Sequence, residues 1–446
     1  MKKISGLIVI VAILSLVLSF SAGAEEFQVI RFLNQETDPT VVGILRQWVE
    51  GFTEENPNTD IILESAPPTV IMHKISTYVQ AGAPLDVIGG DSGSTARMVA
   101  EGLLEPIDEV IEALGGRDAF LPGRLLVYDD TVYAINMIPS TPVLHYRKDL
   151  FEEAGLEPPD TWEDLMHAVK TLHSDEVAGI AIPGGENRHC TIFSGIFLWQ
   201  NGGDFFDRDL NVTIDNERTY EALEFYAELL QYAPPDAAGW AYLEPLESFA
   251  AGRAAMVPFW NGLDLLWRLN PDMIEEDRVG IVLMPKGKMR ATERGGRFLT
   301  VFTTSEHKDL AKNWIEYMFR PENAYQLNEL QPMFYQPATY EAMELLMESD
   351  APNLQAYGQY LFDVLYPGAE HSYMSIFHAG GINPETLEIE ETGIFNPLVS
   401  VLHTSALYAR AVQRVAYEGW SAEDAAREAQ RELEAQVEVA RAEMGL

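Results

Sequence analysis

Apolar and polar positions follow two different periods through the first part of the chain. Residues 27–34, 60–66 and 85–89 are short, largely apolar runs, which are typical of buried strands. Residues 41–52 and 70–80 lie between them and place apolar side chains at intervals of three or four, as on one face of a helix. The order strand, helix, strand, helix, strand predicts a parallel sheet with crossover helices, in which ligands bind beyond the carboxyl ends of the strands.

Later segments show the same two kinds of signal. Thr161 and Ser421 each stand three residues before an Asp and begin a stretch with helical spacing, a pattern typical of a capped helix start. Residues 278–284 and 297–304 have the composition of strands, and a basic, glycine-rich segment separates them. The chain is therefore predicted to belong to the α/β class.

The amino-terminal segment has the features of a secretory signal peptide. Lys2 and Lys3 precede an apolar run over residues 4–20, and Ala22 and Ala24 then form an A-x-A cleavage site. The apolar run is slightly long for a signal peptide, so an uncleaved membrane anchor is the alternative. We expect cleavage after about Ala24, because two acidic residues follow the A-x-A site directly.

The cysteine content fits an exported protein without a lipid anchor. Cys190 is the only cysteine, so the chain cannot form an internal disulfide. No cysteine directly follows the apolar run to accept a lipid. Together with the signal peptide, this predicts a soluble protein of the periplasm.

The chain is strongly acidic. Its 446 residues include 30 Lys and Arg against 69 Asp and Glu, which gives a formal net charge of −39. Nucleic acids and anionic lipid surfaces are bound by cationic side chains, so neither is expected as a partner. We expect the acidic residues to lie mainly on the solvated surface. The hydrophobic share of 47% excludes a wholly disordered chain and supplies sizeable cores.

Motifs for several kinds of catalysis and cofactor binding are absent from the sequence. There is no H-E-x-x-H or Cys/His cluster for a metal, no G-x-S-x-G for a nucleophilic serine, and no G-x-x-x-x-G-K-[ST] for a nucleotide. We therefore expect no catalytic residue, no metal site and no cofactor, and binding is favoured over catalysis. A secreted glycoside hydrolase stays an alternative, because carboxylate pairs arise by chance among so many acids.

Three groups of residues place a tryptophan beside amide, glycine or other aromatic residues. They are Trp199 with Asn201, Trp240 with Tyr242, and Trp260 with Asn261. An indole face can cover the apolar face of a sugar ring, while amides, carboxylates and Arg side chains satisfy its hydroxyls. Packing in the core is the alternative for each tryptophan. It is the favoured interpretation for the four that lie within helical patterns, Trp48, Trp162, Trp267 and Trp314.

Several segments, in order along the chain, resemble one family of binding proteins. Residues 132–172 read VYAINMIPSTPVLHYRKDLFEEAGLEPPDTWEDLMHAVKTL, residues 102–107 read GLLEPI, and residues 249–256 read FAAGRAAM, shortly before Trp260. Together they resemble the maltose-binding type of extracellular solute-binding protein, which feeds ABC sugar importers. Arg147 stands where that family usually has Asn, a departure expected to lie outside the ligand cleft.

The resemblance implies a two-lobed periplasmic binding protein fold of the type II kind. Each lobe would be a mixed, mainly parallel sheet flanked by helices. After a signal peptide of residues 1–24, the N-terminal lobe would comprise residues 25–139 and 291–338. The C-terminal lobe would comprise residues 140–290 and 339–446.

The resemblance also implies a hinge between the lobes. Crossover strands would lie near residues 138–142, 285–296 and 333–339. The lobes would close on a ligand in the cleft between them, and the closed form would be recognised by the membrane subunits of an ABC permease. We expect the binding protein itself to be a monomer.

Ligand contacts follow from the same resemblance. Glu36 and Asp91 look like hydroxyl acceptors of the N-terminal lobe, and Trp260 looks like the stacking platform. The other expected contacts are Ser92, Trp199, Asn201, Trp240, Tyr242, Asn261, Gly296, Arg297 and His378. A phosphorylated or acidic sugar stays open, because Arg188, Arg294 and Arg297 could also serve the site.

The favoured function is that of the periplasmic substrate-binding component of an ABC importer. It would capture a mono- or oligosaccharide in the cleft, without catalysis, and deliver it to the permease. The acidic composition suggests an alternative, a binding protein for a cationic solute such as a polyamine, which requires several carboxylates to converge on the cleft. The glycoside hydrolase noted above is the second alternative.

Overall fold

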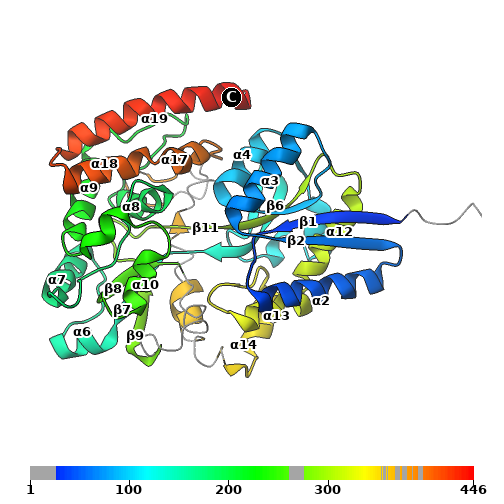
Figure 1. Cartoon of the computed structure of the whole chain (residues 1–446), viewed down its shortest axis with the longest axis horizontal. Helices are drawn as coiled ribbons and strands as arrows, with labels where there is room; N and C mark the ends of the chain where they lie inside the picture. The colour runs from blue at the N-terminus through cyan, green and yellow to red at the C-terminus, as the bar shows by residue number, and fades with distance from the viewer. Residues whose placement is uncertain are drawn as a thin grey trace, which may run out of the picture.

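The computed structural model describes residues 27–260, 276–352, 354, 358, 360–366, 372–373, 379–383, 385–389 and 395–446. The predicted signal peptide and two expected ligand contacts, Asn261 and His378, lie outside the described residues. Figure 1 shows two bodies side by side, each with its own sheet and helices. The two-lobed α/β architecture expected from the sequence is confirmed.

The elements follow one another in three groups along the chain. The first group is β1 (Gln28–Asn34), α2 (Pro39–Glu55), β2 (Thr59–Ser65), α3 (Pro68–Ala81), β3 (Val87–Asp91), α4 (Ser92–Ala100), β4 (Leu104–Glu105), α5 (Asp108–Ala113), β5 (Leu125–Tyr128) and β6 (Thr131–Ser140). The second is β7 (Val143–Arg147), α6 (Lys148–Ala154), α7 (Trp162–Leu172), α8 (Arg188–Gln200), α9 (Glu217–Leu230), α10 (Glu244–Ala250), β8 (Met256–Phe259) and β9 (Val279–Leu283). The third is β10 (Thr292–Glu293), β11 (Gly295–Phe302), α12 (Lys308–Phe319), α13 (Pro321–Leu330), α14 (Tyr340–Met347), β12 (Ser372–Tyr373), α17 (Val399–Ser405), α18 (Leu407–Tyr417) and α19 (Ala422–Met444).

The first lobe is built on a mixed sheet with the strand order β2-β1-β3-β11-β6-β5, and β4 pairs with β11. β1 pairs in parallel with β2 and with β3, as the alternating pattern at the start of the chain predicts. β11 comes from a distant part of the chain and inserts antiparallel between β3 and β6. Phe32 and Leu33, which are adjacent in β1, enter separate cores on the two faces of this sheet.

The second lobe contains a three-stranded antiparallel sheet in the order β8-β7-β9. Ala178 forms one parallel bridge with Ala254 just before β8. The expectation of a mainly parallel sheet is therefore wrong for this lobe. The reason is the chain direction: β8 and β9 both run opposite to β7. Outside this sheet, parallel pairing among the described residues that follow β7 is limited to the bridges of Ala178 with Ala254 and of Thr161 with Lys286 and to the short pair β10–β12.

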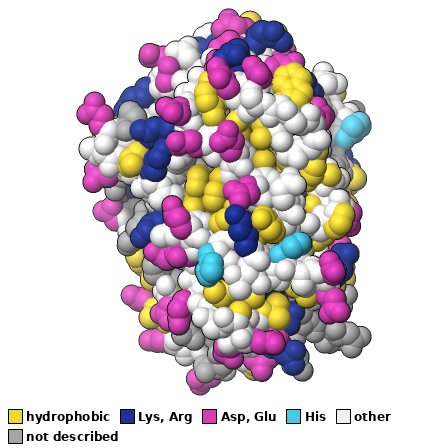
Figure 2. Space-filling view, turned by 90° about the vertical axis from the view of Figure 1, so that its left-hand side faces the viewer, with side chains coloured by type: hydrophobic (Ala, Val, Ile, Leu, Met, Phe, Trp, Pro, Cys, Tyr) yellow, Lys and Arg dark blue, Asp and Glu magenta, His cyan; other side chains and the backbone are white. Residues whose placement is uncertain are grey.

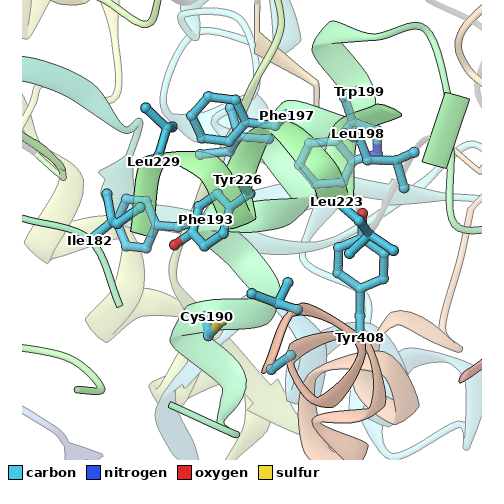
Figure 3. Close-up of a cluster of buried hydrophobic side chains, with 14 of the residues drawn as sticks. Ile182, Cys190, Phe193, Phe197, Leu198, Trp199, Leu223, Tyr226, Leu229 and Tyr408 are labelled. Atoms are coloured by element: carbon cyan, nitrogen blue, oxygen red, sulfur yellow. The ribbon is translucent and has the colours of Figure 1, made fainter. Parts of the chain in front are cut away.

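Most of the second lobe's core surrounds α8, whose middle is buried on all sides. Phe193 and Phe197 of this helix pack with Tyr226 of α9 and Tyr408 of α18 in one buried cluster (Figure 3). Asn187 caps α8 by accepting hydrogen bonds from the backbone N–H groups of His189 and Cys190. This cap fixes the position of the first turn of α8, where Arg188 and His189 lie.

Two connections carry the chain between the sheets. β6 ends at Ser140 in the first sheet and β7 begins at Val143 in the second. β9 ends at Leu283 in the second sheet and β11 begins at Gly295 in the first. The lobe boundaries along the rest of the chain stay a prediction.

The outer face of the second lobe is predominantly polar. Figure 2 shows acidic side chains scattered over this face, with Lys and Arg among them. Many of these charges form ion pairs, such as Arg410 with Glu186 and Glu432. In the part of the chain that the structure describes, no helix is both long enough and apolar enough to cross a bilayer.

Candidate ligand-binding cleft

A cavity of about 590 Å3 lies between the two lobes and receives side chains from both. The first lobe contributes Gln35, Asp91 and Ser92, which stand at the carboxyl ends of β1 and β3. This is the edge where a sheet of this type binds ligands. Tyr242 and Trp260 from the second lobe face the same space.

Asp91 is held at the start of α4. One carboxylate oxygen accepts hydrogen bonds from the backbone N–H groups of Gly93 and Ser94, at 3.1 and 3.4 Å. The other accepts one from the Ser94 hydroxyl at 2.8 Å. Asp91 therefore acts as the N-cap of this helix as well as lining the cavity.

An ion pair spans the cleft. Arg188, the first residue of α8 in the second lobe, lies 3.3 Å from the carboxylate of Asp91 in the first lobe. Burial raises the pKa of Asp91, but the positive charge of Arg188 and the Ser94 hydrogen bond outweigh it, so the pKa lies below its ordinary value. Asp91 is thus ionised at neutral pH, and the pair links the two lobes.

Glu36 lies behind the cavity wall. It is 7% exposed, and its two oxygens are taken by Arg297 and by the Tyr335 hydroxyl, which donates at 2.6 Å. The expectation that Glu36 accepts hydrogen bonds from ligand hydroxyls is not supported by this placement. Its carboxylate instead holds Arg297, which lines the cavity.

The backbone at Gly296 approaches the first lobe closely. The Ser92 hydroxyl donates to the Gly296 carbonyl at 3.3 Å, and a Cβ at position 296 would collide with the amide of Asn136. Only glycine fits here. The structure therefore brings together six of the expected contacts in one cavity: Asp91, Ser92, Tyr242, Trp260, Gly296 and Arg297.

The wall from the second lobe is aromatic. His189 stacks on Tyr242 with ring centroids 4.8 Å apart, and Phe193 meets Trp260 edge to face at 4.7 Å. Burial and the neighbouring Arg188 lower the pKa of His189 to about 4, so this imidazole is neutral at pH 7. The wall offers flat, uncharged ring surfaces to the cavity.

Besides Glu36, three expected contacts lie outside the cavity, so their predicted place in the binding site is not supported. Trp199 is 2% exposed in the core of the second lobe, and its indole N–H donates to Asp204 at 3.2 Å. Trp240 is buried in the same core. Asn201 is also buried and donates to the Arg218 carbonyl at 2.7 Å. These residues have polar neighbours in the sequence, as Trp260 has, so the sequence could not distinguish them. In the structure, the side chain of each points into the interior of the second lobe.

Glu293 was not expected from the sequence, yet it lines the cavity and is 3% exposed. Burial raises its pKa to about 7, an effect that Arg188 reduces and Asp91 adds to. Gln35 and His189 were missed in the same way. No motif marks these positions, although Glu293 lies within residues 285–296, which were predicted to form a crossover.

The arginines divide into two groups. Arg188 and Arg297 line the cavity, and each is paired with a carboxylate. Arg294 turns away and donates to the Pro122 carbonyl at 2.5 Å. Within the described ranges, His, Cys, Asp and Glu side chains form no group able to hold a metal ion.

Comparisons with known proteins agree with this architecture. A family model described as "Bacterial extracellular solute-binding protein" matches residues 38–325. The arabinooligosaccharide-binding protein of Halalkalibacterium halodurans is 22% identical over 396 residues, which cover 84% of this chain and 85% of that protein. A solute-binding protein of Agrobacterium radiobacter K84 in complex with ribitol is similar in structure, with a TM-score of 0.74, 19% identity, and coverage of 92% of this chain and 100% of that one. Maltose-bound MalE3 of T. maritima is similar with a TM-score of 0.72 and 20% identity, over 91% of this chain and 99% of that one.

Proposed function

This chain belongs to the bacterial extracellular solute-binding proteins, and we propose that it captures a neutral carbohydrate or polyol in its inter-lobe cleft for an ABC importer. One observation carries this proposal: the cleft sets an aromatic wall, with Trp260 and Tyr242, against a polar rim at the strand ends of the first lobe. A sugar presents the same combination of apolar C–H faces and a rim of hydroxyls. The arabinooligosaccharide and ribitol named for two similar proteins support this ligand class.

The proposed mechanism is closure of the lobes around the ligand. A ligand that contacts Trp260 on one side and Ser92 on the other favours the closed form, because only that form provides both sets of contacts. The Asp91–Arg188 pair spans the same gap and adds to the stability of the closed form. The closed form would be the one that the permease subunits bind.

The cleft offers little to a cationic ligand. Of the carboxylates near the cavity, Asp91 is paired with Arg188 and Glu36 with Arg297. Glu293 is left as the one lining carboxylate in the described residues without an ion pair, and a polyamine needs several. The acidic composition therefore describes the outer surface better than it describes the site.

Calorimetric titration tests the proposal. The panel consists of arabinotriose, maltose, laminaribiose, ribitol and D-mannitol, with putrescine as the cationic probe. We expect one-to-one binding of at least one neutral member, no heat with putrescine, and no product after prolonged incubation with the oligosaccharides. Binding of putrescine together with silence toward every neutral probe would overturn the proposal, and turnover of an oligosaccharide would show an enzyme.

We also propose that the mature protein is a periplasmic monomer that begins just after Ala24. The sequence signals described above support export, and the family description supports an extracellular location. Intact mass spectrometry of the exported protein checks the cleavage position, and light scattering checks the monomer. A mass that retains residues 1–24 would indicate a membrane anchor instead.

A further inference from the structure

We propose that Glu293 and Gln35 form the hydroxyl-recognition pair of the cleft and select neutral, hydroxyl-rich ligands. This inference rests on the proposed carbohydrate function, because it assigns the polar contacts of that same cavity. Both side chains line the cavity, one from the crossover strand β10 and one from the end of β1. Neither was expected as a ligand contact from the sequence.

Glu293 is a buried carboxylate that lacks protein donors. It is almost fully buried, and its side chain accepts no hydrogen bond from the described part of the chain. Its backbone is fixed by the pairing of β10 with β12, so the side chain faces the cavity from a regular element. Buried carboxylates need hydrogen-bond donors, and ligand hydroxyls can supply them here.

Gln35 is a buried donor that lacks an acceptor. The residue is 6% exposed, and its amide nitrogen has no partner among the described residues. An unsatisfied buried amide costs roughly 1–3 kcal/mol, which a ligand oxygen would recover on binding. Gln35 can donate to a hydroxyl oxygen and Glu293 can accept from a hydroxyl, so the two side chains supply both kinds of hydrogen bond that a polyol uses.

The charges around the pair favour a neutral ligand. The two guanidinium groups that line the cavity are already paired, Arg188 with Asp91 and Arg297 with Glu36. An anionic ligand would have to compete with one of these carboxylates. A cationic ligand would find only Glu293 free for it among the described lining residues.

Binding should also release a proton. The pKa of Glu293 lies at about 7, so the carboxyl is about half protonated at pH 7. Ligand hydroxyls that donate to the carboxylate favour its ionised form and lower this pKa. Affinity should therefore rise with pH, on the order of tenfold between pH 6 and pH 8.

Among the described residues, the other charged groups and histidines in or beside the cavity do not titrate in this range. Arg188 and Arg297 stay positive, and Asp91, with its lowered pKa, stays negative. Burial and Arg188 lower the pKa of His189 to about 4 and that of His403, on α17, to about 3, so both are neutral. Within the described part of the site, a proton released near pH 7 is therefore assigned to Glu293.

The test is calorimetry on the full mature chain with the neutral panel member that binds. Titrations at pH 6, 7 and 8, in phosphate and in imidazole buffer, give the affinity and the number of protons released. We expect about half a proton released at pH 7 by the wild type and by the control Glu247→Gln, an exposed glutamate on α10. Glu293→Gln should bind about tenfold more weakly at pH 8, with no proton release and no pH dependence. Gln35→Ala should weaken binding and leave the proton release unchanged.

The outcomes separate this inference from the proposed function. If no panel member binds the wild type at any pH, the carbohydrate function itself is wrong. If one binds, but without proton release and with equal affinity for Glu293→Gln, the function stands and the recognition pair is refuted. The wild-type proton count decides the matter even if Glu293→Gln does not fold. Equal binding of D-galacturonate by the wild type would overturn the selectivity for neutral ligands.

Discussion

Replacing Glu293 with glutamine should stabilise the ligand-free protein, by an amount that grows with pH. The folded protein keeps the Glu293 proton up to about pH 7, whereas the unfolded chain loses it near the ordinary value of 4.5. Between these two values the unfolded chain binds fewer protons than the folded protein. The free energy of unfolding of the wild type therefore falls as pH rises through this window. Glutamine has no charge to bury, so the variant should not show this loss.

The magnitude follows from the pKa. One pKa unit corresponds to about 1.4 kcal/mol, so a carboxyl that titrates at about 7 instead of 4.5 makes the ionised form cost about 3 kcal/mol. About 2 kcal/mol of this should develop between pH 5.5 and pH 8.5. Any pH-independent effect of the glutamine amide on packing contributes equally at pH 5.5 and pH 8.5, so it cancels when the two values are subtracted.

Urea unfolding followed by tryptophan fluorescence measures the effect. The wild type, Glu293→Gln and the exposed control Glu247→Gln are compared at pH 5.5 and pH 8.5. The advantage of Glu293→Gln over the wild type should grow with pH, while the control should follow the wild type. An advantage that is the same at both pH values would refute the claim that Glu293 is buried without donors. An advantage that grows with pH would instead show that the carboxylate lowers the stability of the free protein in exchange for ligand recognition.

Three further predictions test the rest of the cleft. Trp260→Ala should weaken ligand binding by about 1–3 kcal/mol in calorimetry, with little change in the free energy of unfolding, because its half-buried ring forms part of the cavity wall. Unchanged affinity would show that Trp260 is not the residue on which the ligand stacks. Trp199→Ala should leave ligand binding nearly unchanged but lower the free energy of unfolding by about 3–5 kcal/mol, because that ring fills the core of the second lobe. Glu36→Gln should destabilise the protein by roughly 1–3 kcal/mol, because it removes the charge partner of the partly buried Arg297, and stability equal to wild type in urea unfolding would contradict this network.

A fourth prediction concerns the pair that spans the cleft. Asp91→Asn and Arg188→Gln should each shift the ligand-free population toward the open form, seen as a larger radius of gyration in small-angle X-ray scattering. The pair is partly exposed, so its coupling should be about 1 kcal/mol or less. The double variant should behave like either single one, and additive effects would show that the two residues act independently.

The sequence predicted the first lobe well because its signals are local. Val41, Leu45, Trp48 and Phe52 form the buried face of α2, and Asp38 caps that helix. The strands β1 and β2 begin and end within a residue or so of the predicted runs, and β3 begins and ends two residues later than its run. The direction of β7 and β8 was not predictable in this way, because strand direction depends on how long connections return to the sheet.

The site was predicted in part, and the misses have a physical pattern. Trp260 and Trp199 have similar polar neighbours in the sequence, but the side chain of one faces the cleft and that of the other faces the core. Glu293 and Gln35 act through burial and missing partners, which are properties of the folded chain alone. Asp91 and Ser92 combined a predictable strand end with a place in the cavity.

The placement of β11 has a consequence for how the chain acquires its structure. This strand pairs with β3 and β6, so the sheet of the first lobe stays incomplete until residues far along the chain are available. A fragment that ends at residue 140 would leave both neighbouring strands with open edges, which are templates for aggregation. Contacts between such distant segments also slow folding. The first lobe should therefore be unable to fold alone during synthesis, and the chain should stay competent for passage through a membrane pore until its second half has been made.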